Sequence, residues 1–321
     1  MRFVAVAALL AGCYAPHANP GAPCSPDGEC PSGETCIAGL CEAPGGMQTD
    51  APAQQTDARA IDAPPDATPV LGSDGWYPAT PVLGVNTSSV ETDPTYTSNR
   101  LTIVFASDRA SPGSFDLYVG TRTEATEPFT VTALTTVNST GNDRAPELEP
   151  TGAYIYFTSD RSGSFAVYQS NQTSPGVWSA PAAVSSLAAT NATLSLGVAP
   201  DNTESLVIHD NSGADKFLAY SREAPGDNWS DPYEVATLEI SNEANNPTLT
   251  DEGAVIYLDS GTPAQIYRST SPDDGMTFTA PVPIGDLNLG TRDAAPFVSS
   301  DDNHILFERD GDIYEADRVT P

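Results

Sequence analysis

The sequence predicts an all-β fold: a single five-bladed β-propeller that is closed by an N-terminal strand. Three observations lead to this prediction. A similar segment recurs about every 50 residues from residue 93 onward. Each copy reads as several short strands separated by polar turns, without helical periodicity. The outer strand that the last copy lacks stands before the first copy, at Trp76. Ahead of the propeller we expect a small disulfide-rich module and a disordered linker.

The repeat is clearest where two copies align residue by residue. Residues 93–108 and 145–160 both pass from a proline through a polar turn into an apolar strand that ends in Ser-Asp. The equivalent anchor positions of the five copies are Pro94, Pro146, Leu196, Pro247 and Pro296. A regular period of this length indicates a repeat architecture in which each copy forms one supersecondary unit.

Four strands are expected in each copy. The anchor strand is followed by an apolar strand, such as residues 154–157, and by a strand that ends in tyrosine, such as residues 165–168. The last segment starts with an aromatic residue and contains proline, as at residues 178–181, and proline is tolerated at a sheet edge. Four strands that end at such an edge correspond to one propeller blade.

Closure of the ring is predicted from the outer strand. In the complete copies the outer aromatic residue precedes the next anchor by about 18 residues, and Trp76 stands at this distance before Pro94. The fifth copy stops after Tyr314 without an outer strand of its own. Pairing residues 76–82 with residues 312–316 would complete the last blade and hide both sheet edges.

The N-terminus has the features of an exported protein. Residues 1–12 combine a positive start, an apolar run too short to span a bilayer, and small residues, as secretory signal peptides do. With Cys13, this segment resembles the lipobox of bacterial lipoproteins, which implies that Cys13 is acylated after cleavage. An ordinary signal peptide followed by an incidental cysteine is the alternative. The resemblance implies a lipoprotein of the outer membrane, on its periplasmic face or at the cell surface.

Residues 13–43 are expected to form a lipid-anchored, cysteine-rich module. Four closely spaced cysteines in an exported chain indicate two disulfides of open connectivity; they are Cys24, Cys30, Cys36 and Cys41. A zinc site is the alternative, but C-x-x-C pairs are missing and the compartment is oxidising. Residues 44–69, rich in Pro, Ala and Asp, are expected to be a flexible linker to the propeller at residues 70–321.

The charge excludes one class of partner. The chain has 43 acidic and 13 basic residues and a formal net charge of −30, which repels phosphate backbones, so we expect no nucleic-acid binding. Solubility alone would also account for this charge. No phosphate-binding glycine loop, nucleophile elbow or His pair with metal spacing is present in the sequence. We therefore expect no cofactor and no metal, and we expect the membrane anchor and an envelope protein or glycan as partners.

Residues 145–161, with Gly163 and Tyr168 after them, resemble the TolB-like propeller repeat, a WD40-like repeat. The pattern runs from a proline through a polar turn and an apolar strand to Ser-Asp-Arg, and then to a strand that ends in tyrosine. The resemblance covers about residues 91–321 and fades in the third copy, where Leu196 replaces proline. It implies a module for interactions in the periplasm or at the cell surface, in a family of mixed function.

The candidate site is one mouth of the central channel. Residues just before each anchor are expected to enter the innermost strands there; they are Glu91, Asp93, Asp143, Arg144, Asn245, Arg292 and Asp293. Such carboxylate, guanidinium and amide groups are suited to bind a sugar, a peptide or a cation. By contrast, Asp108-Arg109 and Asp160-Arg161 are interpreted as capping carboxylates with local ion pairs, and His209 and His304 as ordinary packed or surface residues.

Two functions remain open. The first is a non-catalytic, tethered scaffold that binds a protein or a glycan by its mouth or its loops. The second is a glycoside hydrolase that resembles the five-bladed arabinanase-type enzymes, with carboxylates in the central funnel as acid, base or nucleophile. Glu91, Asp143 and Asp293 are the trio with matching placement. Carboxylates that point together into the funnel would favour the hydrolase, and carboxylates turned into turns or paired with arginine would exclude it.

Overall fold

The computed structural model describes residues 35–37, 40–42, 71–187, 192–198, 204–210, 216–224, 226–235, 238, 244–250, 254–272 and 277–318. The chain divides into two compact units, Met1–Ala63 and Pro64–Pro321, of which the second is the propeller. None of the described residues belongs to a helix that is long and apolar enough to span a membrane.

The first unit is described at two short strands. β1 (Thr35–Ile37) and β2 (Leu40–Glu42) pair antiparallel, with Cys36 opposite Cys41. The side chains of these two cysteines lie outside what the structure describes, so the structure gives the predicted disulfide-rich module no support. Cys13, Cys24 and Cys30 lie outside the described residues, as does the predicted linker.

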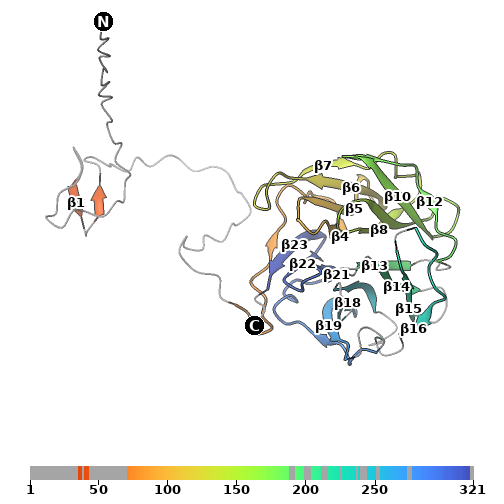
Figure 1. Ribbon diagram of the computed structural model, residues 1–321. Helices are drawn as coiled ribbons and strands as arrows, with labels where there is room; N and C mark the ends of the chain where they lie inside the picture. Colours follow the sequence, from red (N-terminus) through yellow and green to blue (C-terminus); the bar gives the residue numbers. More distant parts are fainter. Residues whose placement is uncertain are drawn as a thin grey trace, which may run out of the picture. The chain divides into compact units, whose positions relative to one another are not determined.

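The second unit consists of antiparallel sheets arranged around a ring (Figure 1). One sheet contains β4 (Glu91–Tyr96), β5 (Thr102–Ser111), β6 (Ser114–Thr121) and β7 (Thr130–Ala133). The next contains β8 (Asp143–Leu148), β9 (Tyr154–Ser159), β10 (Ala166–Ser174), β11 (Val177–Trp178) and β12 (Ala182–Ala183). In both, strand order from the centre outward follows the chain.

The other sheets continue the ring. They comprise β13 (Ala192–Val198), β14 (Glu204–Asp210), β15 (Lys216–Arg222) and β16 (Tyr233–Glu234), followed by β17 (Asn245–Leu249), β18 (Val255–Ser260), β19 (Gln265–Thr270) and β20 (Val282–Pro283). The last sheet has β21 (Asp293–Val298), β22 (His304–Arg309), β23 (Asp312–Asp317) and β3 (Thr80–Pro81). The innermost strands contact one another in turn, and β21 contacts β4.

The strand that closes the ring, β3, comes from the N-terminal end of the propeller, as the sequence predicts. β3 pairs with β23, so that Tyr314 is opposite Pro81. Further backbone hydrogen bonds run from Tyr77 N–H to Asp317 at 2.9 Å and from Val82 N–H to Ile313 at 2.9 Å. Figure 1 shows the orange N-terminal segment beside the blue C-terminal strands. Pairing of these two ends covers an edge that would otherwise be open.

The number of regular blades differs from the prediction. Five equivalent four-stranded blades were expected, but only four of the described sheets have four strands. The sheet of residues 143–183 has five, because β10 pairs with β11 at Gln172 and with β12 at Tyr168. β10 is long, and its irregular outer half forms a hairpin with β11. The fold is therefore an all-β propeller with four regular blades, and the prediction of five is wrong.

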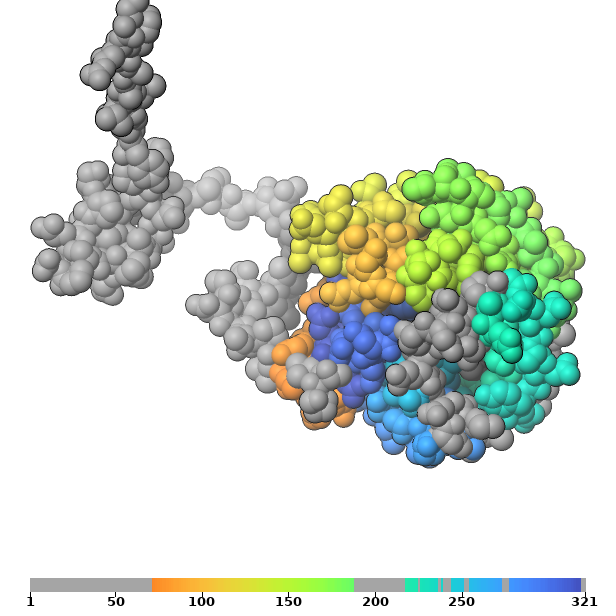
Figure 2. Space-filling model, in the orientation of Figure 1, coloured from red at the N-terminus to blue at the C-terminus, as the bar shows by residue number. Residues whose placement is uncertain are grey.

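The hydrophobic core is divided among the interfaces between neighbouring sheets. Aromatic residues of the outer segments close these interfaces from outside: Trp76, Phe129, Trp178, Trp229 and Phe278 are all buried. Consecutive residues of a second strand point to opposite faces of its sheet. Tyr156 and Phe157 therefore pack into the interfaces on the two sides of their sheet. Figure 2 shows successive segments of the chain, coloured from orange to blue, following one another around the propeller.

The innermost strands share one irregularity. Asp93, Ala145, Asn246 and Ala295 have φ between 46° and 51°, and each precedes an anchor proline. At the same place the pairing register shifts, for example between Thr92 and Thr95. A left-handed residue at such a bulge bends the strand and changes which side chains face the channel. This bend determines the geometry of the candidate site.

Candidate functional site

Glu91, at the start of β4, is held inside a turn. Its side chain is fully buried, and its Oε1 atom accepts hydrogen bonds from Arg109 Nη2 at 3.0 Å and from the Ser107 hydroxyl at 2.9 Å. Its Oε2 atom accepts the backbone N–H of Thr87 at 2.8 Å. Both carboxylate oxygens therefore stabilise the segment that leads into the innermost strand.

The same arrangement recurs in two other sheets. Asp143 accepts hydrogen bonds from Arg161 Nη2 and from the backbone N–H of Ser139, both at 2.6 Å. Asp293 accepts Arg309 Nε at 2.6 Å and a backbone N–H of the preceding turn at 2.7 Å. Each arginine also lies over two aromatic rings of its own sheet, 4.6 to 5.1 Å from their centroids.

These contacts correct the prediction that Glu91, Asp143 and Asp293 form a ligand-binding or catalytic funnel. Each carboxylate is buried and paired with an arginine, and each also accepts backbone N–H groups. Such an environment occupies the carboxylate oxygens with donors and separates the group from solvent. A glycosidase acid needs the opposite, a carboxyl group that exchanges protons next to the sugar.

In the Asp-Arg pairs that follow the second strands, the aspartate and the arginine bond to different partners. Asp108 accepts the backbone N–H groups of Gly113 and Val90, both at 2.9 Å, which confirms the predicted capping role. These hydrogen bonds lower the pKa of Asp108. Arg109 pairs with Glu91, 18 residues away in the chain, so the predicted local ion pair is corrected.

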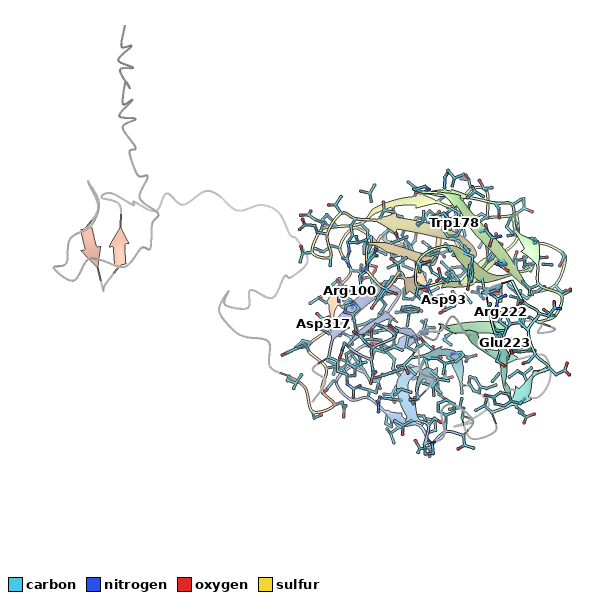
Figure 3. The ribbon with its side chains drawn as sticks, in the orientation of Figure 1. Asp93, Arg100, Trp178, Arg222, Glu223 and Asp317 are labelled. Carbon is cyan, nitrogen blue, oxygen red and sulfur yellow. The ribbon has the colours of Figure 1, made fainter. Side chains whose placement is uncertain are left out.

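Asp93 and Arg292 lie in the central channel, where sheets meet (Figure 3 labels Asp93). The Thr92 hydroxyl donates to Glu308 at 2.8 Å, and Arg292 forms an ion pair with the same carboxylate. Asp93 Oδ2 accepts the backbone N–H of Ala145, in the next sheet, at 3.1 Å. The space among the anchor prolines is only about 20 Å³, which suits a water molecule and excludes a sugar.

Asp259 is the carboxylate of this channel that the sequence did not point to. Its Oδ2 atom accepts the backbone N–H of Ala295 at 2.6 Å and the Asn246 amide at 2.7 Å. Burial raises the pKa of Asp259 to about 6, and the two hydrogen bonds and the nearby Arg292 only partly oppose it. The group therefore joins two sheets and carries a proton in mildly acidic solution.

The remaining predicted residues, Asn245 and Arg144, do not form a common site. Asn245 begins β17 and is the pairing partner of Asp259. The Arg144 guanidinium lies over the ring of Phe115, 4.7 Å from its centroid, where it packs two sheets together. Asp259 and Glu308 form a cluster of carboxylates at the channel. Of the seven predicted funnel residues, the structure brings Asp93 and Arg292 near this cluster.

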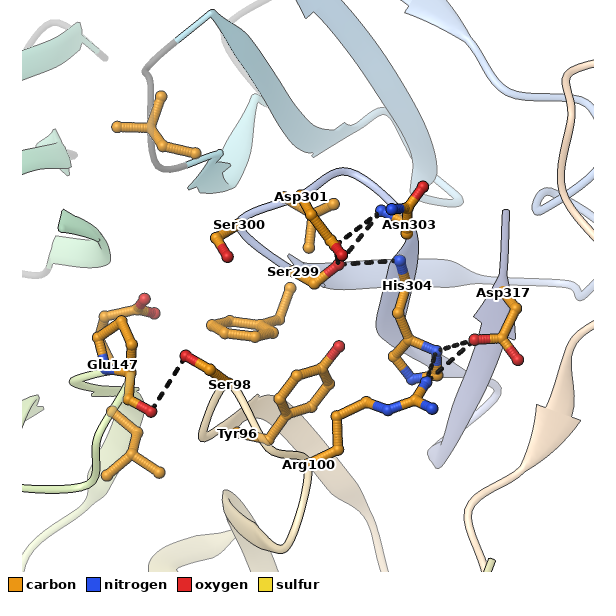
Figure 4. A pocket seen from close by; sticks show the side chains of 15 residues that line it. Tyr96, Ser98, Arg100, Glu147, Ser299, Ser300, Asp301, Asn303, His304 and Asp317 are labelled. Carbon is orange, nitrogen blue, oxygen red and sulfur yellow. Dashed lines mark hydrogen bonds and ion pairs between the residues drawn. The ribbon is translucent and has the colours of Figure 1, made fainter. Parts of the chain in front are cut away.

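A larger pocket lies where the innermost strands end, and we call it the downstream pocket (Figure 4). Its volume is about 320 Å³. The rings of Tyr96 and Phe297 lie in it edge to face, with centroids 5.1 Å apart, and Leu148 and Leu249 add apolar surface from other sheets. Polar groups surround them: Ser98, Arg100, Glu147, Ser299, Ser300, Asp301, Asn303, His304 and Asp317.

Three buried polar atoms of residues that line this pocket make no hydrogen bond to a described residue. They are the Tyr96 hydroxyl, the Asn303 Oδ1 atom and the His304 Nε2 atom. Ser299 lies close to the Tyr96 hydroxyl but outside hydrogen-bonding geometry, and burial raises the pKa of Tyr96. Leaving a buried polar group unpaired costs free energy, so such atoms are places where a ligand gains affinity.

Turns between the first and second strands position the polar side of the pocket. Arg100 and Asp302 occupy equivalent left-handed positions, with φ of 58° and 57°, and their N–H groups bond back to Thr97 and Ser299. The left-handed residue turns the chain tightly. As a result, the side chain of Arg100 reaches across to the last sheet.

Arg100, His304 and Asp317 form a charged cluster at one side of the pocket. His304 Nδ1 lies 2.7 Å from both Arg100 Nη1 and Asp317 Oδ1, and Arg100 Nη1 lies 3.0 Å from Asp317 Oδ1. His304 Nε2 faces Glu315 at 3.3 Å. Hydrogen bonding from His304 lowers the pKa of Asp317 to about 2, and Arg100 adds to this effect. Figure 3 shows Arg100 and Asp317 close together.

The sequence interpretation of His304 as an ordinary packed residue was incomplete. His304 is buried as expected, but it also lines the downstream pocket and joins the charged cluster. Its partners are far away in the chain, and no motif connects them. The one available signal was that the turns at 97–101 and 299–303 occupy equivalent positions of the repeat and are rich in polar residues.

Among the residues that the structure describes, no group of three or more His, Cys, Asp or Glu side chains is arranged to hold a metal ion. The lining of the downstream pocket offers hydrogen bonds, charge and aromatic contact.

No protein-family model and no curated protein matches the chain. Similar solved structures include an α-L-arabinofuranosidase from Podospora anserina in complex with cellotriose, 12% identical, with a TM-score of 0.53 over 77% of this chain and 98% of that chain. The GH43_1 enzyme from Xanthomonas citri in complex with xylose is 13% identical, with a TM-score of 0.53 over 74% and 89%. TolB from Acinetobacter baumannii is 15% identical, with a TM-score of 0.45 over 73% and 56%. At these identities the likeness shows the propeller fold alone. The TM-score of the TolB match is too low to support a conclusion.

Proposed function

We propose that this protein binds a saccharide in the downstream pocket without cleaving it. The observation that carries the proposal is the pair of aromatic rings, Tyr96 and Phe297, which lie next to a polar rim. The apolar face of a sugar ring packs on aromatic carbon, and its hydroxyl groups hydrogen-bond to carboxylates, amides and hydroxyls. A volume of about 320 Å³ suits one or two sugar units at the end of a longer chain.

The unpaired polar atoms support a ligand with many hydroxyl groups. Sugar hydroxyls both donate and accept, so one ligand can satisfy the Tyr96 hydroxyl and the Asn303 carbonyl oxygen together. A purely apolar ligand would leave both atoms unpaired and would lose affinity accordingly.

The test begins with a glycan array on the full chain, followed by calorimetric titration of the best glycan. Replacement of Phe297 by alanine should weaken binding by at least ~10-fold, because it removes the aromatic contact. Tyr233→Ala, which removes an exposed aromatic residue elsewhere on the ring, is the matched control and should bind as the wild type does. If no glycan binds, or if the Phe297 variant binds equally well, the proposal fails.

We further propose that the pocket is held at the outer membrane by an acylated Cys13, as the lipobox resemblance implies. The residues concerned lie outside the described part of the chain. Metabolic labelling with a fatty-acid analogue should mark the wild-type protein and leave Cys13→Ala unmarked. Label that persists in the variant would contradict this proposal.

A glycoside hydrolase is the second candidate. The observation that favours it is the shared propeller fold of the arabinofuranosidase and the GH43_1 enzyme, although that likeness is one of fold. With Glu91, Asp143 and Asp293 paired to arginine, the acids for such a reaction would be Glu147 and Asp301, which both line the downstream pocket. Hydrolysis requires two carboxyl groups on opposite sides of the bond.

This candidate is separated from the first by product analysis. Any glycan that binds is incubated with the protein and examined for shortened products. Products that form with the wild type and vanish with Glu147→Gln would establish the hydrolase. Binding without products is the result that the non-catalytic function predicts.

A further inference from the structure

We propose that His304 is a specificity-determining residue of the downstream pocket: protonation of its imidazole releases Arg100, which then binds the carboxylate of an acidic saccharide. This inference rests on the proposed function, because it assumes a saccharide in the pocket. It names the class of ligand that the pocket prefers in mildly acidic solution, which is a sugar that carries a carboxylate, such as a uronic acid.

His304 Nδ1 has two neighbours that cannot both form a hydrogen bond with it at the same time. His304 Nδ1 lies 2.7 Å from Arg100 Nη1 and 2.7 Å from Asp317 Oδ1. A guanidinium only donates hydrogen bonds, and a carboxylate only accepts them. Nδ1 therefore bonds to Arg100 when it carries a lone pair, and to Asp317 when it carries a proton. The two bonds exclude each other.

The second ring nitrogen connects this choice to protonation. His304 Nε2 lies 3.3 Å from Glu315 Oε2. In the neutral ring, a proton on Nε2 faces Glu315 and leaves Nδ1 as the acceptor for Arg100. In the protonated ring Nδ1 donates to Asp317, the charged ring forms an ion pair with Glu315, and Arg100 faces a cation in place of an acceptor. Protonation thus removes the hydrogen bond between His304 and Arg100.

Arg100 is the member of the cluster that protonation displaces, because its other bond, to Asp317 Oδ1 at 3.0 Å, is to the oxygen atom that the Nδ1 proton of His304 also binds. The His304 side chain is 5% exposed, and its ring contacts that of Tyr96 with centroids 5.5 Å apart. Arg100 has a long side chain that is 34% exposed and starts from a surface turn. It lines the downstream pocket and also a neighbouring groove of about 840 Å³ beside β3. A small rotation therefore turns its guanidinium toward a ligand.

The charged and titratable groups around His304 come from each element packed against it. Tyr96 and Arg100 belong to β4 and its turn, Arg122 follows β6, and Asp301 lies in the turn before β22, while Glu315 and Asp317 lie on β23. With a neutral imidazole, the two arginines are outweighed by the three carboxylates, which disfavours an anionic ligand. A protonated imidazole balances the three carboxylates together with the two arginines, so the cost of bringing a further carboxylate near is reduced.

This charge balance determines how the affinity for an acidic saccharide depends on pH. The test compares pH 5.5 with pH 7.5, and the lower pH favours the protonated imidazole. Binding of an acidic saccharide should strengthen as the pH falls through this range. The free carboxylate of a uronic acid titrates well below pH 5.5. A neutral sugar of the same shape lacks the group that Arg100 would bind, so its affinity should stay nearly constant.

The experiment uses the full chain and three matched pairs of sugars: galactose and galacturonate, glucose and glucuronate, and mannose and mannuronate. Dissociation constants are measured by calorimetry at both pH values. For a pair that binds, the ratio of the neutral-sugar constant to the uronate constant should rise by about 10-fold from pH 7.5 to pH 5.5. His304→Gln should remove this change with pH.

Two further variants keep the test decisive. His209→Gln, on β14 in another sheet, is the matched histidine control and should keep the wild-type pH dependence. Arg100→Gln alters a partly exposed side chain and should lose the preference for uronate at both pH values, even if the His304 variant does not fold. Thermal melting verifies that each variant is folded.

The outcomes separate the two proposals. If neutral sugars bind and the preference for uronate does not change with pH, this inference is overturned and the proposed function stays in place. A change that persists in His304→Gln would also overturn it. Failure of both neutral and acidic sugars to bind would overturn the proposed function, and this inference with it.

Discussion

The buried arginines determine, residue by residue, how the innermost strands begin. Arg161 donates to Asp143 at 2.6 Å and to the backbone carbonyl of Val137 at 2.7 Å, while its planar head lies on Phe157 and Tyr168. Lysine cannot reproduce this arrangement, because it lacks the planar fork. The charge pair is thus part of the packing of the blade and is not available for chemistry.

Removal of one partner tests this structural role. Arg161→Leu leaves the fully buried Asp143 carboxylate without its cation, and the loss should be about 3–5 kcal/mol of unfolding free energy. Urea unfolding measures this loss. Combining the change with Asp143→Asn removes the uncompensated charge and should recover part of it. A loss below ~1 kcal/mol in the single variant would show that the pair is not structural.

Asp259 gives the protein a specific dependence on pH. Its pKa is raised to about 6 from the ordinary value of 3.8, so the folded state binds a proton that the unfolded state releases between these values. By linkage, stability falls as the pH rises from 4 through 6, at a cost on the order of 3 kcal/mol above pH 7. The cost is absent below about pH 4, where both states are protonated.

Asp259→Asn should remove that cost. The asparagine carbonyl oxygen can still accept from Ala295 N–H and Asn246, so the contacts between sheets persist. We expect the variant to be more stable than the wild type at pH 8 and equally stable at pH 4, as measured by urea unfolding at both pH values. Equal stability at pH 8 would show that Asp259 is not buried in its charged form.

The sequence predicted the residues of the funnel but not their directions. A regular strand would place alternate residues, such as Glu91 and Asp93, on one face toward the channel. Instead, the left-handed residues before the anchor prolines shift the register, and Glu91 turns into its own loop while Asp93 remains in the channel. Positive φ at Asp93 and Ala145 is not implied by their residue types, since residues before proline ordinarily prefer extended conformations.

At the level of strands and sheets, the repeat pattern was sufficient for most of the ring. Alternating apolar residues and polar turns predicted the second and third strands, and the displaced Trp76 segment predicted the pairing of β3 with β23. The extra strand β11, which pairs with the irregular end of β10, was not foreseen, because two residues carry no pattern of their own. The disulfide module was inferred from cysteine count, which says nothing of geometry.

Trp76 is the residue of the closing segment whose loss is easiest to measure. It is 1% exposed, packs edge to face on Tyr257 and lies under the guanidinium of Arg318. Trp76→Ala should lower the unfolding free energy by about 3–5 kcal/mol, because it empties the interface that closes the ring. Denaturant unfolding monitored by circular dichroism provides the measurement.

The matched control for this prediction lies in the same segment. Leu83 is 58% exposed, so Leu83→Ala should change stability by less than ~0.5 kcal/mol. Equal effects of the two changes would contradict the view that the segment closes the ring through its buried aromatic residue.

At the level of the whole molecule, the pocket assembles residues that the sequence keeps apart. Tyr96 and Phe297 come from the first and last innermost strands and meet only because the ring closes. The sequence predicted a polar site at the channel and located it at the beginning of those strands, where arginines occupy the carboxylates. The downstream pocket depends on turn geometry and on contacts across more than 200 residues, such as Arg100 with His304, for which no local pattern exists.

A crystal structure of the protein with the best-binding saccharide tests the central claim most directly. We predict a sugar ring in the downstream pocket, packed on Tyr96 and Phe297, with its hydroxyl groups bonded to Tyr96 and Asn303. The buried carboxylates of Glu91, Asp143 and Asp293 should keep their arginine partners. A sugar bound at the other mouth of the channel, in contact with those three carboxylates, would contradict the account.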